Sequence, residues 1–595
     1  MNRIKNIILA ILYAGLVISC KPEIHDVPVP ATGGVNFKEY VALGNSLTAG
    51  FSDGGLYLEV QQQSYPAIIA EQMKEINTGL NFNQPEMPSG NGSGYFKLKT
   101  LDLVNGVFDF VILPPDATWT NKIPGTYQNL GITGIRVRDI AVNGYGANTT
   151  QGNPYFYRIL GEQEANKSYL DVVSESNATF FTSWLGPNDV FEYAFSGGSD
   201  GIEGQPGTGI NGLTPVDDFE ASYDAFMNVM AGKGASGFLM TIPDVTNIPF
   251  FTSVGWNALA MNTEQAAAAT AGYAAMIDPQ VEAGVAEATI NLVATDTVLS
   301  VGVIPDLADT TVFLQAYQAA IAGGADQATA LQIAEDYVES QEGIAKIAFL
   351  ESELNVELPA HLLGQPTSPE LDPLFAIIDE QLATNVELQQ AIAQTRDQIT
   401  QAYEAGFLPS LEAVVAQQTA AQITALKAAG IYPTFIAGNN GFVIEVPVSQ
   451  ANPLGIRQMV AGELVLFSII LTDELTPQKA ALPKPDDLVL TLEEIGNIRE
   501  YTEQYNDIIE GYASTNMGIL NMEVVYESIQ AGAFIDGVEV NADFIQGGVF
   551  SLDAIHLTPR GYAIVANSLI QAINQKFGST IPPVNISDYR AVILP

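Results

Sequence analysis

The chain has 595 residues and a formal net charge of −44, so it is long enough for a large hydrophobic core and for more than one domain. Its 23 basic residues against 67 acidic ones leave no basic surface for nucleic-acid phosphates, and we expect no nucleic-acid partner. A single cysteine excludes an internal disulfide framework.

The N-terminal segment has the pattern of a signal peptide. Basic residues precede the apolar stretch Ile7–Ile18, which is shorter than an ordinary membrane span. Val17-Ile18-Ser19-Cys20 fits a lipobox, so we expect a signal peptide over residues 1–19 and a lipid on Cys20. The alternative is cleavage elsewhere, with an incidental cysteine.

A lipid on Cys20 implies membrane anchoring in the cell envelope, and we expect the outer membrane, with the protein facing the periplasm or the cell surface. Residues 20–36 include three prolines and are expected to form an extended tether. No later apolar run reaches the ~18 residues of a spanning helix, so the anchor is expected to be lipid alone. The sequence leaves the leaflet and the oligomeric state open.

Four short apolar runs each end in a polar or glycine-containing loop. They are Tyr40–Leu43 before Ser46, Ile140–Val142 before Gly144, Ala178–Leu185 before Asn188, and Gly237–Ile242 before Pro243. Such runs, alternating with helical segments, predict an α/β domain whose parallel sheet carries a site at the carboxyl ends of its strands.

A helix is predicted to begin near residue 214. Thr214 can cap it, Pro215 suits the first turn, and the acidic residues that follow suit the helix dipole. The upstream segment 207–212 reads GxGxxG but follows no predicted strand, so we interpret it as a surface loop rather than a dinucleotide site.

From residue 262 to 430 the chain is rich in Ala, Gln and Glu at helical spacing. Gly323-Gly324 interrupts this pattern and indicates an antiparallel helical hairpin. We expect a large all-α insertion whose apolar stripes pack against one another rather than form a lipid groove.

Nucleophilic catalysis by serine needs a base and a third group that orients the base. Asp553 lies three residues before His556, so one turn could direct its carboxylate at Nδ1 and leave Nε2 for Ser46. The other two histidines, His25 and His361, lie in proline-containing segments far from these motifs. With no HExxH motif and so few histidines, we expect no metal and no other cofactor.

Three motifs resemble blocks I, III and V of the SGNH (GDSL) hydrolases, in the expected order. They are Gly44-Asn45-Ser46-Leu47, Gly186-Pro187-Asn188-Asp189 and Asp553-Ala554-Ile555-His556. Asn45 stands where the family name has Asp. The run from Gly548 to Tyr562 is similar to SGNH lipoproteins of the Bacteroidetes type. The resemblance covers residues 37–261 and 431–595 and leaves the insertion unassigned.

The resemblance implies a three-layer α/β/α sandwich with a flavodoxin-like parallel sheet and the activity of a serine esterase or lipase. It implies a triad of Ser46, Asp553 and His556. It further implies an oxyanion hole formed by the N–H groups of Ser46 and Gly144 and the side chain of Asn188, with Gly146 as the alternative glycine.

The resemblance leaves the ester open among acetylated glycans, short-chain esters, lysophospholipids and thioesters. A second hypothesis from another class also stands. In it the chain is a surface lipoprotein that binds a glycan or a protein partner through the helical insertion, and the hydrolase fold is an inactive scaffold.

Overall fold

The computed structural model describes residues 30–77, 79–102, 107–150, 152–198, 212–277, 432–447, 455–476 and 479–595, with a few isolated positions between 316 and 337. The predicted signal peptide, Cys20, residues 20–29 of the tether, residues 207–211 and most of the predicted insertion lie outside the described residues. Predictions for those segments stay predictions.

The centre of the protein is a parallel five-stranded sheet. Its strands are β1 (Tyr40–Gly44), β4 (Asn129–Gly131), β5 (Phe180–Trp184), β6 (Ser236–Met240) and β13 (Met517–Leu520). The spatial order is β13-β6-β5-β1-β4. Numbered along the chain this is the doubly wound order 2-1-3-4-5, which reverses direction between β1 and β5. The predicted α/β class with a parallel sheet is confirmed.

The ends of β1, β4 and β5 lie side by side in the register of the sheet. Gly44 at the end of β1 pairs with Gly131 of β4 on one side and with Trp184 of β5 on the other. All residues of β1 and β5 are buried, as expected of central strands that are covered on both faces. The loops that follow these strands therefore emerge side by side at one edge of the sheet.

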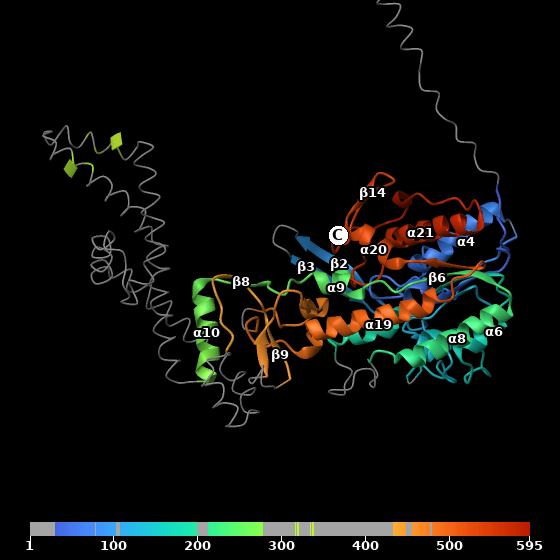
Figure 1. Ribbon diagram of the computed structural model, residues 1–595, viewed down its shortest axis with the longest axis horizontal. Coiled ribbons are helices and arrows are strands. Elements are labelled where there is room, and N and C mark those ends of the chain that lie inside the picture. Colours follow the sequence, from blue (N-terminus) through green and yellow to red (C-terminus); the bar gives the residue numbers. More distant parts are fainter. Residues whose placement is uncertain are drawn as a thin grey trace, which may run out of the picture.

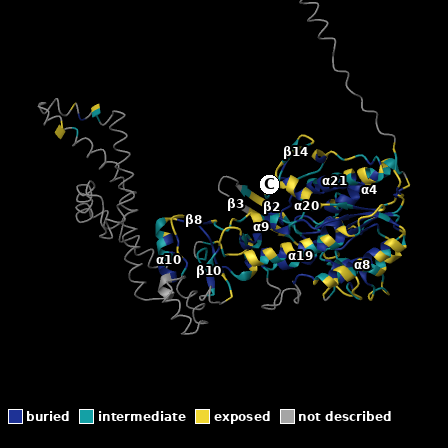
Figure 2. Cartoon of the chain, viewed as in Figure 1, coloured by how far each residue is buried: buried dark blue, intermediate teal, exposed yellow. Residues whose placement is uncertain are grey.

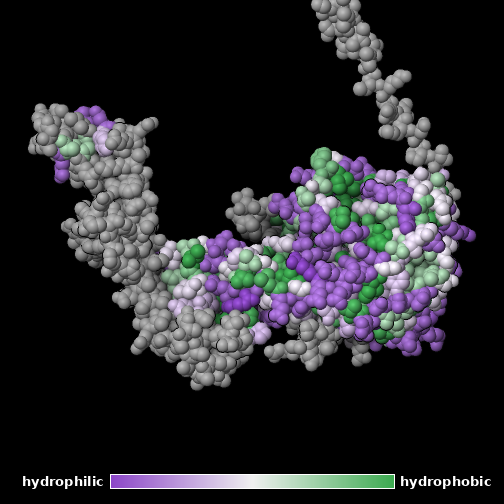
Figure 3. Space-filling model, in the orientation of Figure 1, coloured by the Kyte–Doolittle hydropathy of each residue, from purple (hydrophilic) through white to green (hydrophobic). Residues whose placement is uncertain are grey.

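Helices cover both faces of the sheet (Figure 1). One layer contains α4 (Tyr65–Ile76), α20 (Met522–Gln530) and α21 (Pro559–Phe577), and the other contains α6 (Tyr169–Glu175), α8 (Val216–Gly232) and α19 (Leu492–Glu510). The helix α7 (Pro187–Phe195) packs against α19. The inner faces of the helices and the sheet form the buried centre (Figure 2), while hydrophilic residues predominate over α19 on the outside (Figure 3).

Short helices occupy the loops of this domain. They are α2 (Ser46–Ala49), α3 (Leu58–Gln61), α5 (Pro154–Ile159), α9 (Pro249–Thr252) and the 3-10 turns η1 (Val137–Asp139), η2 (Val245–Asn247) and η6 (Ile586–Asp588). Two antiparallel hairpins lie at the periphery, β2 (Tyr95–Asp102) with β3 (Val107–Leu113) and β14 (Ala533–Ile535) with β15 (Val538–Val540).

A second, smaller hydrophobic cluster lies beside the main domain. It contains α10 (Thr263–Ile277), the antiparallel pairs β7 (Leu259–Met261) with β8 (Gly438–Asn440), β9 (Val443–Glu445) with β10 (Ile456–Gln458) and β11 (Leu464–Val465) with β12 (Val489–Leu490), and the 3-10 turns η4 (Phe467–Leu471) and η5 (Asp486–Leu488). The β7–β8 pair joins the two chain segments that flank the predicted insertion. Across the described residues, no helix combines the length and the apolar character needed to cross a membrane.

Two local predictions are wrong. Ile140–Val142 is a turn after η1 rather than a strand, because only Ile140 is buried and Val142 is 46% exposed. The strand that was missed, β4, has only three residues and includes the polar Asn129. Thr214 does not cap α8 either, because its hydroxyl donates to Asp189 and Pro215 occupies the cap position.

Two glycines should respond to alanine in opposite directions. A Cβ on Gly518 in β13 would lie 2.3 Å from the buried Phe238 ring, whereas Gly496 in α19 is exposed with nothing within 4 Å. We predict that Gly518→Ala destabilises the protein by about 1–3 kcal/mol through overpacking. We predict that Gly496→Ala stabilises it by about 0.5–1 kcal/mol. Urea unfolding of both variants measures the difference, and equal shifts would contradict the described packing of β13 on β6.

Candidate active site

Ser46 lies at the turn from β1 into α2. Gly44 ends the strand in close contact with its neighbours, since a Cβ there would lie 2.9 Å from the carbonyl oxygen of Trp184. The Asn45 side chain then accepts a hydrogen bond from the Leu47 N–H at 3.0 Å and caps the short helix. An Asp side chain could cap the helix in the same way, and the cap holds Ser46 at the first helical position.

The structure brings Ser46, His556 and Asp553 together. The Ser46 Oγ lies 2.9 Å from His556 Nε2, and His556 Nδ1 lies 2.8 Å from Asp553 Oδ2. The Ser46 residue is 6% exposed and the His556 side chain 14% exposed, so the three groups are largely shielded from water. The spacing of Asp553 and His556 produces the orientation expected from the sequence.

The turn that carries this pair is closed by the Asp553 carboxylate itself. Its Oδ1 accepts the N–H groups of Ile555 at 3.0 Å and of His556 at 2.8 Å. Ala554, between Asp553 and Ile555, has a φ of +62°, a left-handed conformation that a non-glycine residue adopts only where contacts hold it. The ring of Phe51 packs against the His556 imidazole with centroids 4.6 Å apart. The imidazole is therefore fixed in position and tilt.

Asp553 is ionised in this setting. Burial alone would raise its pKa, but His556 and the two backbone N–H groups outweigh burial and hold the pKa at about 2. An ionised carboxylate at Nδ1 fixes the tautomer that leaves Nε2 able to accept a proton from the Ser46 hydroxyl.

Asn188 is the second residue of α7, the helix that begins shortly after β5. Its Nδ2 donates to the carbonyl oxygen of Ile135 at 3.0 Å. The next residue, Asp189, is buried and accepts from the Val137 N–H at 2.8 Å and from Thr214 Oγ1 at 2.6 Å. These bonds tie α7 to the loop after β4, so Asn188 and that loop keep a fixed relation at the sheet edge.

The structure does not place the two glycines predicted for an oxyanion hole beside Ser46. Gly144 and Gly146 do not line the cavity that contains Ser46 and His556, because Gly144 faces Ala165 and Asn166 and Gly146 packs against α5. Gly134, with a φ of +82°, lines the cavity instead. The missed signal was Asn129-Leu130-Gly131-Ile132-Thr133-Gly134, in which a short polar strand precedes the glycine.

The cavity beside Ser46 has a volume of about 370 Å³ and lies where the loops after β1, β4, β5 and β6 meet. Much of its wall is apolar, formed by Leu47, Phe191, Phe195, Val245, Ile248 and Ile555. Glu192 is the one carboxylate among the described lining residues. This position is the topological switch point of the sheet, where doubly wound folds bind ligands.

Cys20, His25 and His361 lie outside the described residues. Among the residues that the structure describes, no group of three or more His, Cys, Asp and Glu side chains is arranged to hold a metal ion. Comparison of the chain with family models, with curated proteins and with solved structures found no match.

Two buried carboxylates predict opposite pH effects on stability. The pKa of Asp553 is lowered to about 2, against about 3.9 in an unfolded chain, so its stabilising contribution is present above ~pH 3.9 and is lost as the pH falls through 2. Burial raises the pKa of Asp189 to about 7, partly offset by its two hydrogen bonds, so ionising it destabilises the fold as the pH rises from ~4 through 7.

We predict that the stability advantage of the wild type over Asp553→Asn shrinks by up to about 2 kcal/mol between ~pH 4 and ~pH 2. The advantage of the wild type over Asp189→Asn shrinks instead between ~pH 4 and ~pH 8. Urea unfolding across this range measures both differences. Differences that do not change with pH would contradict the assigned ionisation states.

Proposed function

We propose that this protein is a serine esterase of the SGNH hydrolase type that cleaves carboxylic esters through an acyl-enzyme intermediate. The observation that carries the proposal is the continuous chain of contacts, 2.9 and 2.8 Å long, from Ser46 Oγ through His556 to Asp553. Ser46 and His556 line a cavity. A serine, an imidazole and a carboxylate in this order form an activated nucleophile.

In the first half-reaction the Ser46 oxygen attacks the ester carbonyl carbon while His556 Nε2 takes the hydroxyl proton. Asp553 stabilises the imidazolium that forms. The tetrahedral intermediate collapses by breaking the bond to the alkoxide, which receives the proton from His556. Water then attacks the acyl-enzyme in the same way, with His556 as base, and releases the acid and the free Ser46.

Three donors can meet the negative charge on the carbonyl oxygen. The N–H groups of Ser46 and Gly134 have no acceptor in the described part of the chain, and both residues line the cavity. Asn188 uses one amide hydrogen on Ile135 and keeps a second donor. Each such donor is typically worth about 3 kcal/mol of transition-state stabilisation. Gly134 therefore replaces Gly144 in the proposed oxyanion hole.

The cavity lining favours an ester with an apolar acyl group. Phe191, Val245 and Ile248 offer apolar surface next to Ser46, and burial of an acyl chain there is favourable at roughly 25 cal/mol per Å². Glu192 on the same wall disfavours anionic groups through charge repulsion. The signal peptide and the lipid on Cys20 would hold this activity at the cell envelope, a part of the proposal that rests on the sequence.

Replacement of the nucleophile tests the enzymatic proposal. We predict that Ser46→Ala lowers kcat for p-nitrophenyl butyrate by about 10⁴-fold or more, because the acyl-enzyme cannot form. The matched control is Ser174→Ala, which removes an exposed hydroxyl of α6 and leaves turnover unchanged. Equal rates for wild type and Ser46→Ala would sink the proposal.

Filling the cavity tests the substrate preference. We predict that Ile248→Trp moves the preference among p-nitrophenyl esters toward shorter acyl chains, because the indole occupies the volume that a longer chain needs. Ile112→Trp, on the 70% exposed position of the peripheral hairpin, is the control and keeps the wild-type profile. The ratio of kcat/KM for octanoate and acetate esters measures the effect. An unchanged ratio in Ile248→Trp would place the acyl chain elsewhere.

A further inference from the structure

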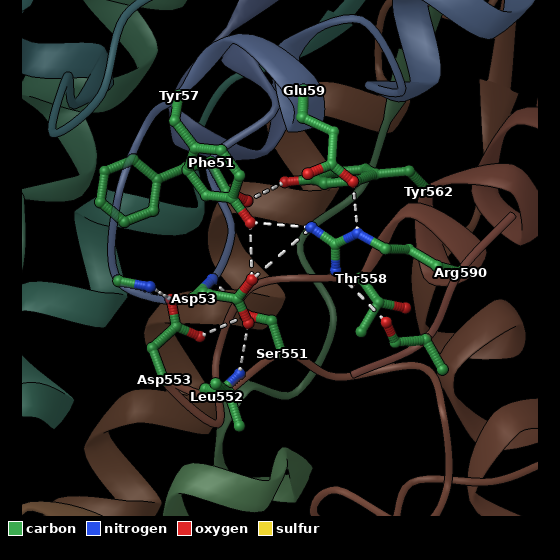
Figure 4. A network of polar contacts seen from close by, with 12 residues as sticks. Phe51, Asp53, Tyr57, Glu59, Ser551, Leu552, Asp553, Thr558, Tyr562 and Arg590 are labelled. Carbon is green, nitrogen blue, oxygen red and sulfur yellow. Dashed lines mark hydrogen bonds and ion pairs between the residues drawn. The ribbon is translucent and has the colours of Figure 1, made fainter. Parts of the chain in front are cut away.

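We propose that Asp53, Tyr57 and Arg590 form a positioning unit that fixes the carboxylate of Asp553 behind His556; this inference rests on the proposed function. None of the three lines the cavity. They belong to the loop after α2 and to the C-terminal segment, and Figure 4 shows them gathered around the turn that carries Asp553.

The unit begins with a tight turn after α2. Ser52 and Gly55 close the turn with reciprocal backbone hydrogen bonds of 2.9 and 3.0 Å. Asp53, between them, has a φ of +55°, a left-handed conformation that costs roughly 1–2 kcal/mol for a non-glycine residue. The contacts of the turn must offset this cost. Its effect is to direct two successive N–H groups at the segment from Ser551 to Asp553.

Those two N–H groups bind the acid segment directly. Gly54 N–H donates to Asp553 Oδ2 at 2.8 Å, and Asp53 N–H donates to Ser551 Oγ at 2.8 Å. Ser551 Oγ in turn donates to Asp553 Oδ1 at 3.0 Å. The turn after α2 therefore holds Oδ2 of Asp553 directly and Oδ1 through Ser551. Oδ2 is also the oxygen that binds His556.

The Asp53 side chain holds the same segment at its middle residue, Leu552. Its Oδ1 accepts the Leu552 N–H at 3.0 Å and its Oδ2 accepts the Tyr57 hydroxyl at 2.7 Å. Asp53 therefore makes contacts on both sides of the peptide between Ser551 and Leu552. A shift of this peptide would move Asp553, the next residue, relative to the imidazole.

Arg590 balances the charge of this arrangement. Its Nη2 donates to the Tyr57 hydroxyl at 2.9 Å and lies 3.9 Å from Asp53 Oδ2, while its Nε contacts Glu59 at 2.5 Å. Asp53 and Asp553 are 5% and 8% exposed, so two carboxylates share a poorly solvated region. A nearby guanidinium lowers the cost of keeping both of them ionised.

The Tyr57 hydroxyl connects Asp53 with Arg590, and its removal is the smallest change that tests the positioning unit. Its ring stacks on Tyr95 with centroids 4.1 Å apart, so Tyr57→Phe can keep the ring in place and remove only the hydroxyl that links Arg590 to Asp53. Asp53→Asn removes the charge while an oxygen remains for Leu552. Tyr95→Phe is the matched control, because it removes the hydroxyl of the stacked partner, which makes no hydrogen bond to Asp53 among the described residues.

The first experiment separates kcat from KM for an ester substrate. We predict that kcat falls about tenfold in Tyr57→Phe and about 10²-fold in Asp53→Asn, with KM within twofold of wild type, because the catalytic groups are displaced while the cavity is intact. Tyr95→Phe keeps both constants. Equal kcat in all four proteins, or losses that follow KM and thermal unfolding alone, would overturn the positioning role.

The second experiment needs no turnover. The chain has three histidines, so ¹⁵N-histidine labelling and a His556→Gln reference assign the low-field Nδ1–H proton of His556. We expect this proton to be protected from exchange with water in wild type and Tyr95→Phe, and to exchange at least tenfold faster in Asp53→Asn and Tyr57→Phe. Unchanged exchange in both variants overturns the proposal. Absence of ester turnover in wild type would contradict the proposed function alone, since the exchange rates still decide the positioning role.

Discussion

The contact between Ser46 Oγ and His556 Nε2 joins residues separated by 510 positions, and the fold is the means by which this contact is made. β1 lies between β5 and β4 in the sheet, and Ser46 follows it at the point where the strand order reverses. The acid turn reaches the same point just before α21 begins, and α21 packs on the sheet beside α4. The hydrogen bond between the Asp553 carboxylate and His556 Nδ1 is formed within a turn of only four residues.

The motifs that carry chemistry were readable from the sequence because their geometry is local. Asp553 and His556 orient each other within one turn, and Asn188 follows a strand whose five residues are aromatic, small or β-branched and fully buried. Such segments have a strong pattern. The sheet class and three of the four proposed strands followed from the same patterns. The spacing of residues did not predict that Ser46 and His556 meet. That prediction came from the resemblance to a family.

Two features could not be predicted from the sequence, the strand β4 and the contacts of Asp53 and Arg590. β4 has three residues and contains Asn129, so its hydropathy gives no strand signal, whereas the apolar run at Ile140 has one. The contacts of Asp53 and Arg590 have no local sequence signal. Asp53 and Arg590 acquire their relation only through tertiary contacts with residues about 500 positions away or more, and a lone Asp in Ser-Asp-Gly-Gly reads as ordinary turn chemistry.

The most direct test of the account is a crystal structure after reaction with a fluorophosphonate, which mimics the tetrahedral intermediate. We predict a single covalent bond to Ser46 Oγ, with the phosphoryl oxygen hydrogen-bonded to the N–H groups of Ser46 and Gly134 and to Asn188, and the alkyl chain along Ile248. Modification of another residue, or an unmodified Ser46 at full exposure to the reagent, would contradict the central claim that folding makes Ser46 a nucleophile.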